Sequence, residues 1–232
     1  NNSDNLNFIE AWVTSVSYSL QLYFDFSGYV DMAIGIALLF NISLPLNFNS
    51  PYKSKNIRVF WQNWHITLGR FLRDYLYIPL GGNKISNKIT MRNIIITFFL
   101  GGLWHGAAWT FIFWGLLHGF ALITLKIWEK FNIKINKYIS ILVTLIFVNF
   151  SWVFFRANSW QEAINVIKGM IGFNGIILPK FLENYFSFLS LLGIRFGGTF
   201  VNIQGDIILL LCLIVALIIV FAFKNSYQIV MN

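Results

Sequence analysis

The sequence carries very little charge for its length. Of its 232 residues only 11% are Asp, Glu, Lys or Arg, whereas 57% are hydrophobic, and the mean hydropathy is +0.65. Soluble domains carry about 25% charged residues, so this composition argues against a soluble domain and predicts an integral membrane protein. We expect a single membrane-embedded domain over residues 1–232, all-α and polytopic, with interfacial amphipathic helices.

Several catalytic motifs are also missing. The single cysteine, Cys212, excludes an intrachain disulfide and a cysteine-based metal site. No serine lies in a nucleophile elbow, and neither a glycine-rich phosphate loop nor an HExxH pair occurs. The three histidines, His65, His105 and His118, are forty and thirteen residues apart, so no two have the spacing of a helical metal pair. We therefore expect no metal ion, and no nucleic-acid ligand.

One long stretch, from Arg92 to Lys126, contains no charged residue between its ends. It is far longer than the roughly 20 residues that span a bilayer, so it must bend, and the glycines within residues 101–106 mark the bend. A titratable imidazole at membrane depth is a functional candidate. His105 lies at this bend, although a buried histidine satisfied by a neighbouring carbonyl is an equally good interpretation of its position alone.

Basic residues flank this stretch on both sides. The preceding segment holds eight against one acid, Asp74: Lys53, Lys55, Arg58, Arg70, Arg73, Lys84, Lys88 and Arg92. The following segment holds Lys126, Lys130, Lys134 and Lys137. Because cytoplasmic loops are rich in Lys and Arg, both ends are predicted to be cytoplasmic, which makes the uncharged stretch a bent hairpin.

Two further helical segments precede the hairpin. Ala11 to Leu44 is predicted to form two membrane-embedded helices around Ser27–Gly28. Asp25 and Asp31 in that segment should face water or the protein interior, and we favour hydrogen bonding to neighbouring helices over catalysis.

The next segment, Asn56 to Ile78, is predicted to be one amphipathic helix, with Trp61 and His65 on a shared face. A histidine on an interfacial helix is ordinary, so His65 has a plain structural explanation as well as a functional one. His118 is about 220° around a continuous helix from His105 and is interpreted as a packing residue.

The remaining segments follow the same logic. Tyr138–Phe155 and Asp206–Phe223 are predicted spans, an amphipathic helix should begin after Ser159, and Phe181–Leu192 should be interfacial. Residues 156–205 are then expected on the outer side.

Several ordered blocks carry a resemblance to a known family. QLYFDFSGYVDMAIGIALLF, LPLNFNSPY, FWQNWHITLGRFLRDYLYIPLGG and GGLWHGAAWTFIFWGLLHG resemble the membrane-bound O-acyltransferases, in particular the bacterial alginate and peptidoglycan O-acetylases. The resemblance is dense over Tyr18–Gly119 and weaker through WVFFRANSWQEAINVIKGM. The D-alanine exporters of teichoic acid biosynthesis form a sister branch, but YIPLGG favours the acetylases.

The resemblance implies that His105, in the WHG block, is the essential catalytic residue and that His65, in WHITL, is the second polar residue of the active site. It also implies helices around a tunnel, with an acyl donor entering from the cytoplasm and an acceptor approaching from the other side. The chain begins NNSDNL without Met, and we expect it to be the carboxy-terminal part of such a core.

The expected function is therefore transfer of acetyl from acetyl-CoA, which is not a tightly bound cofactor, to hydroxyls of an exported or cell-wall polysaccharide. His105 would be the general base, with a pKa suited by desolvation, and His65 would orient or polarise the acyl group. Transfer would be direct or through an extracytoplasmic (periplasmic) acetyltransferase partner, in the lipid of the inner (plasma) membrane. The alternatives are D-alanyl transfer to teichoic acid-like acceptors, a non-catalytic channel or transporter subunit, and an inactive remnant.

Six further residues are candidates for substrate binding. Four basic side chains near the His65 segment are expected to steer a phosphate-bearing donor, although anionic lipid headgroups explain them equally well. Together with an acid and an aromatic neighbour of His105, the set is Arg70, Arg73, Lys84, Lys88, Asp74 and Trp104.

Overall fold

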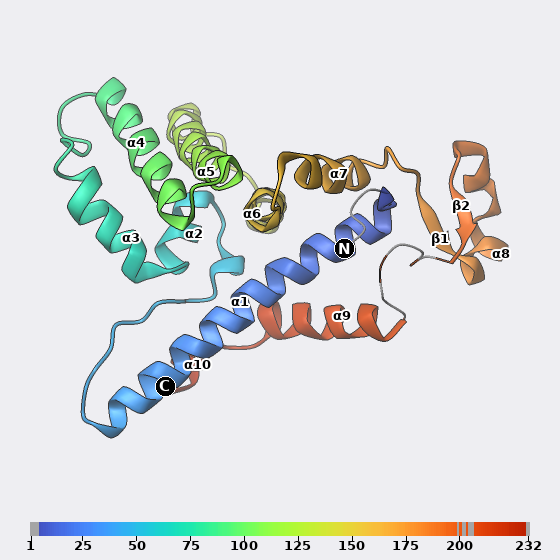
Figure 1. Cartoon of the computed structure of the whole chain (residues 1–232), viewed down its shortest axis with the longest axis horizontal. Helices are drawn as coiled ribbons and strands as arrows, with labels where there is room; N and C mark the ends of the chain where they lie inside the picture. The colour runs from blue at the N-terminus through green and yellow to red at the C-terminus, as the bar shows by residue number, and fades with distance from the viewer. Residues whose placement is uncertain (1–4, 199, 201–202, 204–206, 231–232) are drawn as a thin grey trace.

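The computed structural model describes residues 5–198, 200, 203 and 207–230. The chain there is mostly helical with almost no strand (Figure 1), which confirms the predicted all-α class. The helices are α1 (Phe8–Leu39), α2 (Ile57–Asn63), α3 (Ile66–Leu72), α4 (Asn87–His105), α5 (Trp109–Trp128), α6 (Lys137–Arg156), α7 (Trp160–Met170), α8 (Glu183–Phe186), α9 (Ile207–Ala222) and α10 (Ser226–Val230). Two short strands, β1 (Ile177–Pro179) and β2 (Arg195–Gly197), pair in parallel.

Within the described residues, three helices are long and apolar enough to cross a membrane: Phe8–Leu39, Trp109–Phe131 and Lys137–Arg156. The third confirms the span predicted at Tyr138–Phe155, and α7 begins directly after its cap, Ser159, as predicted. α9 confirms an apolar helix where the last span was predicted, but with 16 described residues it is not among the helices long enough to cross a membrane, and Asp206 at the predicted start lies outside the described residues. The segment predicted to be interfacial forms α8 and a 3₁₀ turn, and the strands on either side of it were not predicted.

The amino-terminal segment corrects one prediction, because α1 is a single helix of 32 residues and not a pair broken at Ser27–Gly28. A glycine inside a helix costs only about 1 kcal/mol relative to alanine, and no proline is present to end the helix there. Asp25 and Asp31 are exposed in the described structure, so their predicted contacts with neighbouring helices are not seen.

The uncharged stretch folds as the predicted bent hairpin, with α4 and α5 side by side and the bend at residues 106–108 (Figure 1). The glycines within the two helices serve packing rather than bending. A Cβ on Gly102 would lie 2.5 Å from the carbonyl oxygen of Phe111, and a Cβ on Gly115 would collide with the carbonyl of Phe98. Small residues thus let the two backbones approach closely, and both basic flanks come to the same end of the hairpin.

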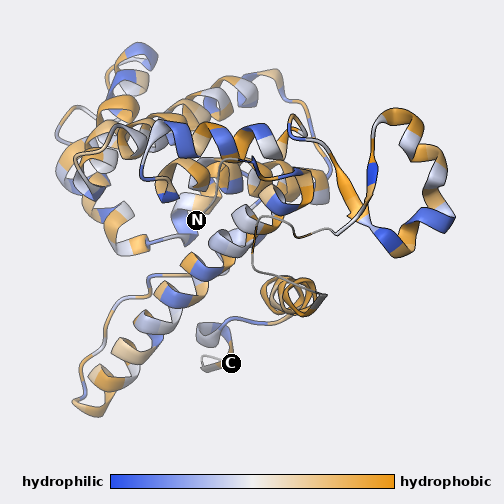
Figure 2. Cartoon of the chain, turned by 45° about the vertical axis from the view of Figure 1, so that its right-hand side comes forward, coloured by the Kyte–Doolittle hydropathy of each residue, from blue (hydrophilic) through white to orange (hydrophobic). Residues whose placement is uncertain are grey.

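The core lies where α2, α5 and α6 meet. Its largest buried members are aromatic, and they include Phe60, Trp64, Trp114 and Trp152. Hydrophobic residues also cover outward-facing parts of the helices (Figure 2), with exposed Leu39, Tyr138 and Leu142 as examples. An apolar exterior is what a membrane-embedded protein needs.

Candidate active site

The predicted amphipathic helix over Asn56–Ile78 is interrupted at the functional candidate itself. α2 ends before Trp64, which is extended, and His65 has a left-handed backbone with φ +43°. Such a conformation is uncommon for a non-glycine residue. The break rotates His65 relative to Trp61, so the predicted shared face is wrong.

A neighbouring loop stabilises this break. The Ile66 amide donates to the carbonyl of Asn47 at 3.0 Å, and the Asn49 amide donates to the carbonyl of Asn63 at 3.0 Å. The loop therefore satisfies the end of α2 and the start of α3, which would otherwise leave polar backbone groups without partners.

The side chain of Asn47 also fixes the His65 imidazole. Its Oδ1 accepts from the Thr67 amide at 3.1 Å and from Thr67 Oγ1 at 2.9 Å, and His65 Nδ1 lies 3.2 Å away. Because Oδ1 only accepts, Nδ1 carries the hydrogen and Nε2 of the neutral ring is an acceptor. Burial beside Phe26 and Phe48 lowers the pKa of His65, which favours this neutral form.

His105 ends α4 and is half-buried in a cage of aromatic rings. Ring centroids lie at 4.9 Å for Trp104, 5.2 Å for Trp114, 5.0 Å for Phe155 and 6.3 Å for Phe111. In the part of the chain that the structure describes, neither ring nitrogen has a hydrogen-bond partner, so the carbonyl-satisfied alternative is not seen there. Both nitrogens are open to a ligand.

The two predicted histidines border one cluster of aromatic rings. Trp64, directly before His65 at the α2–α3 break, packs against Trp152 with ring centroids 5.1 Å apart. Trp152 packs against Phe155 at 5.2 Å, and Phe155 contacts His105 at the α4–α5 bend at 5.0 Å. One imidazole offers an acceptor nitrogen, and the other has both nitrogens without a hydrogen-bond partner among the described residues. Proton transfer to and from a bound hydroxyl is the chemistry that this pair suits.

His118 lies in the packed core, as expected of a packing residue. It is fully buried, Trp61 Nε1 donates to its Nδ1 at 3.2 Å, and its Nε2 lies 2.9 Å from Ser151 Oγ. No nitrogen of His118 is left for a substrate.

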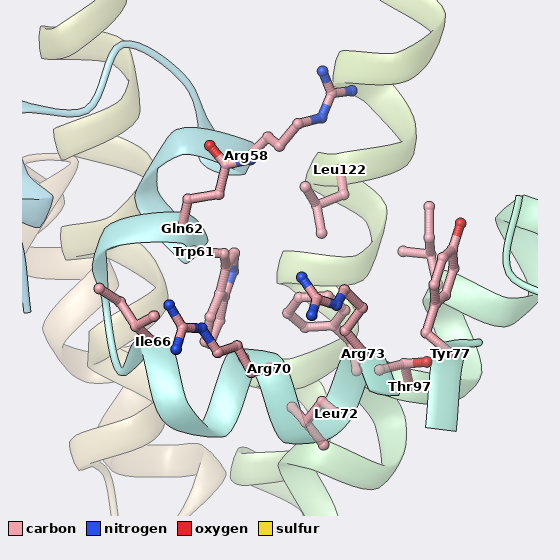
Figure 3. Close-up of a pocket in the computed structure, with 13 residues that line it drawn as sticks. Arg58, Trp61, Gln62, Ile66, Arg70, Leu72, Arg73, Tyr77, Thr97 and Leu122 are labelled. Atoms are coloured by element: carbon pink, nitrogen blue, oxygen red, sulfur yellow. The ribbon is translucent and has the colours of Figure 1, made fainter. Parts of the chain in front are cut away.

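The candidate substrate-binding residues separate into two groups. Arg70 and Arg73 line a pocket of about 530 Å³ between α2, α3, α4 and α5, with Trp61 and Phe98 in its walls (Figure 3). Lys84 and Lys88 are exposed and do not line that pocket. Of the four basic residues that were predicted to act together, only Arg70 and Arg73 line this pocket.

The ion pairs of this region further distinguish the arginines. Arg73 Nε lies 2.7 Å from Asp74 Oδ1 and keeps the pKa of Asp74 below its usual value. Arg58, also in the pocket wall, pairs with Glu129 at 2.6 Å. Arg70 forms no ion pair among the described residues, so its charge is the most available to an anion.

Two other candidates complete the site. Trp104 is 65% exposed and covers one side of His105. Asn47, which fixes His65, was missed by the sequence analysis, because a polar residue in the turn-rich connector after Pro45 carries no signal of its own. Among the described residues, no group of three or more His, Cys, Asp or Glu side chains could hold a metal ion.

Comparison with known proteins agrees with these features. Residues 4–161 match the MBOAT, membrane-bound O-acyltransferase family, and the chain belongs to this family. It is 56% identical to the peptidoglycan O-acetyltransferase of Helicobacter pylori over 189 residues, covering 80% of this chain and 36% of that protein.

More distant relatives show the same partial coverage. The probable alginate O-acetylase AlgI of Pseudomonas aeruginosa is 45% identical over 71% of this chain and 32% of its own length. The teichoic acid D-alanyltransferase of Bacillus subtilis is 36% identical over 62% of this chain and 40% of its own length. The chain thus spans about a third of the length of the curated O-acetylating relatives that it matches.

Proposed function

We propose that the protein containing this chain is a membrane-bound O-acyltransferase that moves acetyl from acetyl-CoA toward hydroxyls of an exported or cell-wall polysaccharide. The relatives named for O-acetylation match at 56% and 45% identity, above the 36% of the D-alanyltransferase. These values favour an acetyl donor over a D-alanyl donor.

The observation that carries the proposal is that His65 and His105, each at a helix break, border one aromatic cluster with ring nitrogens left for a ligand. His105 accepts the proton of the acceptor hydroxyl while that oxygen attacks the acetyl carbonyl. The carbon–sulfur bond then breaks, and the departing sulfur takes the proton back from His105. Neutral His65, whose Nε2 is an acceptor, orients the hydroxyl; this differs from the expected polarisation of the acyl group, which would need a donor.

The donor approaches through the arginine-lined pocket. Coenzyme A carries phosphates, which guanidinium groups bind well, and its body is long enough to need an apolar wall such as that of Trp61 and Leu72. Acetyl-CoA acts as a substrate that exchanges each turnover. Arg70 is the best-placed charge because it has no competing ion pair in the described chain.

The protein is a multi-pass protein of the inner membrane, with both ends of the α4–α5 hairpin on the cytoplasmic side. Lys84 and Lys134, at the two flanks of the hairpin, should therefore react from the same side when replaced by cysteine. Labelling from opposite sides would contradict this topology. An extracytoplasmic acetyltransferase partner receives or positions the acetyl group for the polysaccharide on the other face.

The decisive test uses the full-length protein in liposomes with labelled acetyl-CoA and a polysaccharide acceptor. His105→Ala should lower transfer by about 10²- to 10⁴-fold, the usual contribution of a general base, while the protein inserts at normal levels. Near-normal transfer by this variant would refute the assignment. A wild-type protein that conducts solutes but transfers no label would instead support the channel alternative.

A further inference from the structure

We propose that His118 is a positioning residue that holds His105 in place through Trp114; this rests on the proposed transfer at His105. His118 does not reach the substrate site itself, because it is fully buried and both of its nitrogens are bonded. Its effect passes through the indole ring of Trp114, which contacts both His118 and His105.

The hydrogen bonds of His118 admit one protonation state. The indole Nε1 of Trp61 can only donate, so His118 Nδ1 accepts. The Ser151 hydroxyl donates to the carbonyl of Val148 at 2.8 Å, so it accepts from His118 Nε2 at 2.9 Å. A neutral ring protonated on Nε2 satisfies all of these bonds, and it ties α2, α5 and α6 together at a single point.

Trp114 connects this point to the candidate active site. Its ring centroid lies 5.1 Å from that of His118 and 5.2 Å from that of His105, the second pair at an interplanar angle of 90°. Trp114 Nε1 is buried without a hydrogen-bond partner in the described chain. No hydrogen bond of its own fixes the indole, so packing by its neighbours decides where it lies.

The same chain of contacts reaches the arginine-lined pocket. Trp61, the donor to His118, forms part of the pocket wall (Figure 3). Rings from Trp61 through His118 and Trp114 to His105 are therefore in continuous contact. Displacement of His118 should misplace His105 without removing any group that binds the donor.

A purely structural role makes a different prediction. Buried polar networks are often retained for packing, and breaking one then lowers the amount of folded protein and its Tm. The kcat of the molecules that do fold would not change. Positioning instead predicts a loss of kcat per folded molecule, with little change in KM for the donor.

The experiment compares His118→Phe and His118→Gln in the full-length protein, with kcat referred to folded protein. His118→Phe should lower kcat by about 10- to 100-fold, the effect expected of a small misplacement, and leave KM for acetyl-CoA within about twofold. His118→Gln should recover most of the loss, because an amide can accept from Trp61 and donate to Ser151. Should His118→Phe not fold, Ser151→Ala removes the acceptor of His118 Nε2 without touching the pocket wall, and it is expected to lower kcat in the same direction.

Two further measurements keep the outcomes distinct. The control Ser19→Ala breaks a buried hydrogen bond of 2.8 Å to Asn149, at another contact of α6, and should lower Tm without changing kcat. The rate at which diethyl pyrocarbonate modifies His105, followed by mass spectrometry without donor, should change in His118→Phe and return in His118→Gln.

Unchanged kcat and unchanged His105 reactivity in the folded variants would overturn the positioning role. If the wild type transfers no acetyl at all, the proposed function fails, and the reactivity of His105 still decides whether His118 positions it.

Discussion

His105 and His118 lie thirteen residues apart in similar local sequences, LWHG and LLHG, yet their surroundings differ. Both rings contact Trp114. His118 is fully buried with both nitrogens hydrogen-bonded, whereas His105 is half-buried with neither nitrogen bonded among the described residues. Depth in an apolar helix hairpin therefore does not identify a reactive histidine. We infer that the availability of its nitrogens does, because a fully hydrogen-bonded imidazole has no nitrogen left to bind a substrate.

His65 is intermediate between the two. Its Nδ1 is held by Asn47 and its Nε2 remains an acceptor. Such an arrangement suits a group that orients a substrate in one direction. The three histidines thus form a series from open to half-open to closed, and each prediction below tests one step of that series.

The largest expected effect distinguishes His105, whose nitrogens are open, from His118, whose nitrogens are both bonded. Transfer lost in His105→Ala, about 10²- to 10⁴-fold, should be partly restored by added imidazole, because the half-buried site is reachable from outside. His118→Ala should lose less and should gain nothing from imidazole, since that position is fully enclosed. Acetyl transfer at rising imidazole concentration measures both. Equal rescue of the two variants would remove the distinction between the sites.

The second prediction concerns the half-open ring. Asn47→Ala removes the acceptor for His65 Nδ1 and for both donors of Thr67. Buried donors left without partners cost about 1–3 kcal/mol each, and the tautomer of His65 is released, so we expect kcat to fall by about 10- to 100-fold. Thr67→Val is the control, because it removes only the Thr67 hydroxyl, which lies 3.5 Å from His65 Nδ1, and leaves the shorter contact of 3.2 Å between Asn47 Oδ1 and His65 Nδ1. A kcat for Asn47→Ala equal to that of Thr67→Val would show that the tautomer does not matter.

The hairpin was predictable from the sequence because charge and glycine act locally. Two basic clusters around an uncharged stretch require a bend, and Gly106 follows His105 directly. The break at His65 was not predictable, because apolar residues continue at helical spacing through it and the loop that stabilises it comes from Asn47, eighteen residues earlier. Periodicity reports which side is apolar, but not whether the backbone stays helical.

Local sequence signals also misled the prediction that the α1 segment forms two helices. Gly28 looked like a break, yet a single glycine without proline is too weak to end a long helix. The strand pair β1–β2 joins residues 177–179 to 195–197, and three-residue strands leave almost no pattern. Asn47 was missed because a polar residue in a turn is usual, and only its three-dimensional partners give it a role.

The third prediction applies the same reasoning to the arginines. Arg70→Gln should raise the apparent KM for acetyl-CoA by about tenfold with a small effect on kcat, because a charge-assisted contact is worth about 1.5–3 kcal/mol and part of this site is exposed to water. Arg73→Gln should do less, since Asp74 already holds that guanidinium. Lys84→Gln and Lys88→Gln serve as controls because they lie outside the pocket. Equal KM values in neutral-lipid liposomes would assign these charges to anionic lipid.

The smallest expected effect concerns the exposed side of the His105 cage. Trp104 contacts His105 at 4.9 Å and is 65% exposed, whereas Trp109, just across the bend, is 71% exposed and makes no ring contact with His105 among the described residues. Aromatic pairs are worth about 0.5–1.5 kcal/mol beyond their buried area.

Trp104→Ala should therefore lower kcat/KM by about two- to tenfold, and Trp104→Phe should recover most of the loss by keeping a ring beside the imidazole. Trp109→Ala should leave kcat/KM unchanged, because Trp109 is as exposed as Trp104 but makes no ring contact with His105 among the described residues. A loss in Trp109→Ala equal to that in Trp104→Ala would mean that the bend as a whole contacts the substrate or lipid. The other rings of the cage, Phe111, Trp114 and Phe155, would then be the ones that act on His105 itself.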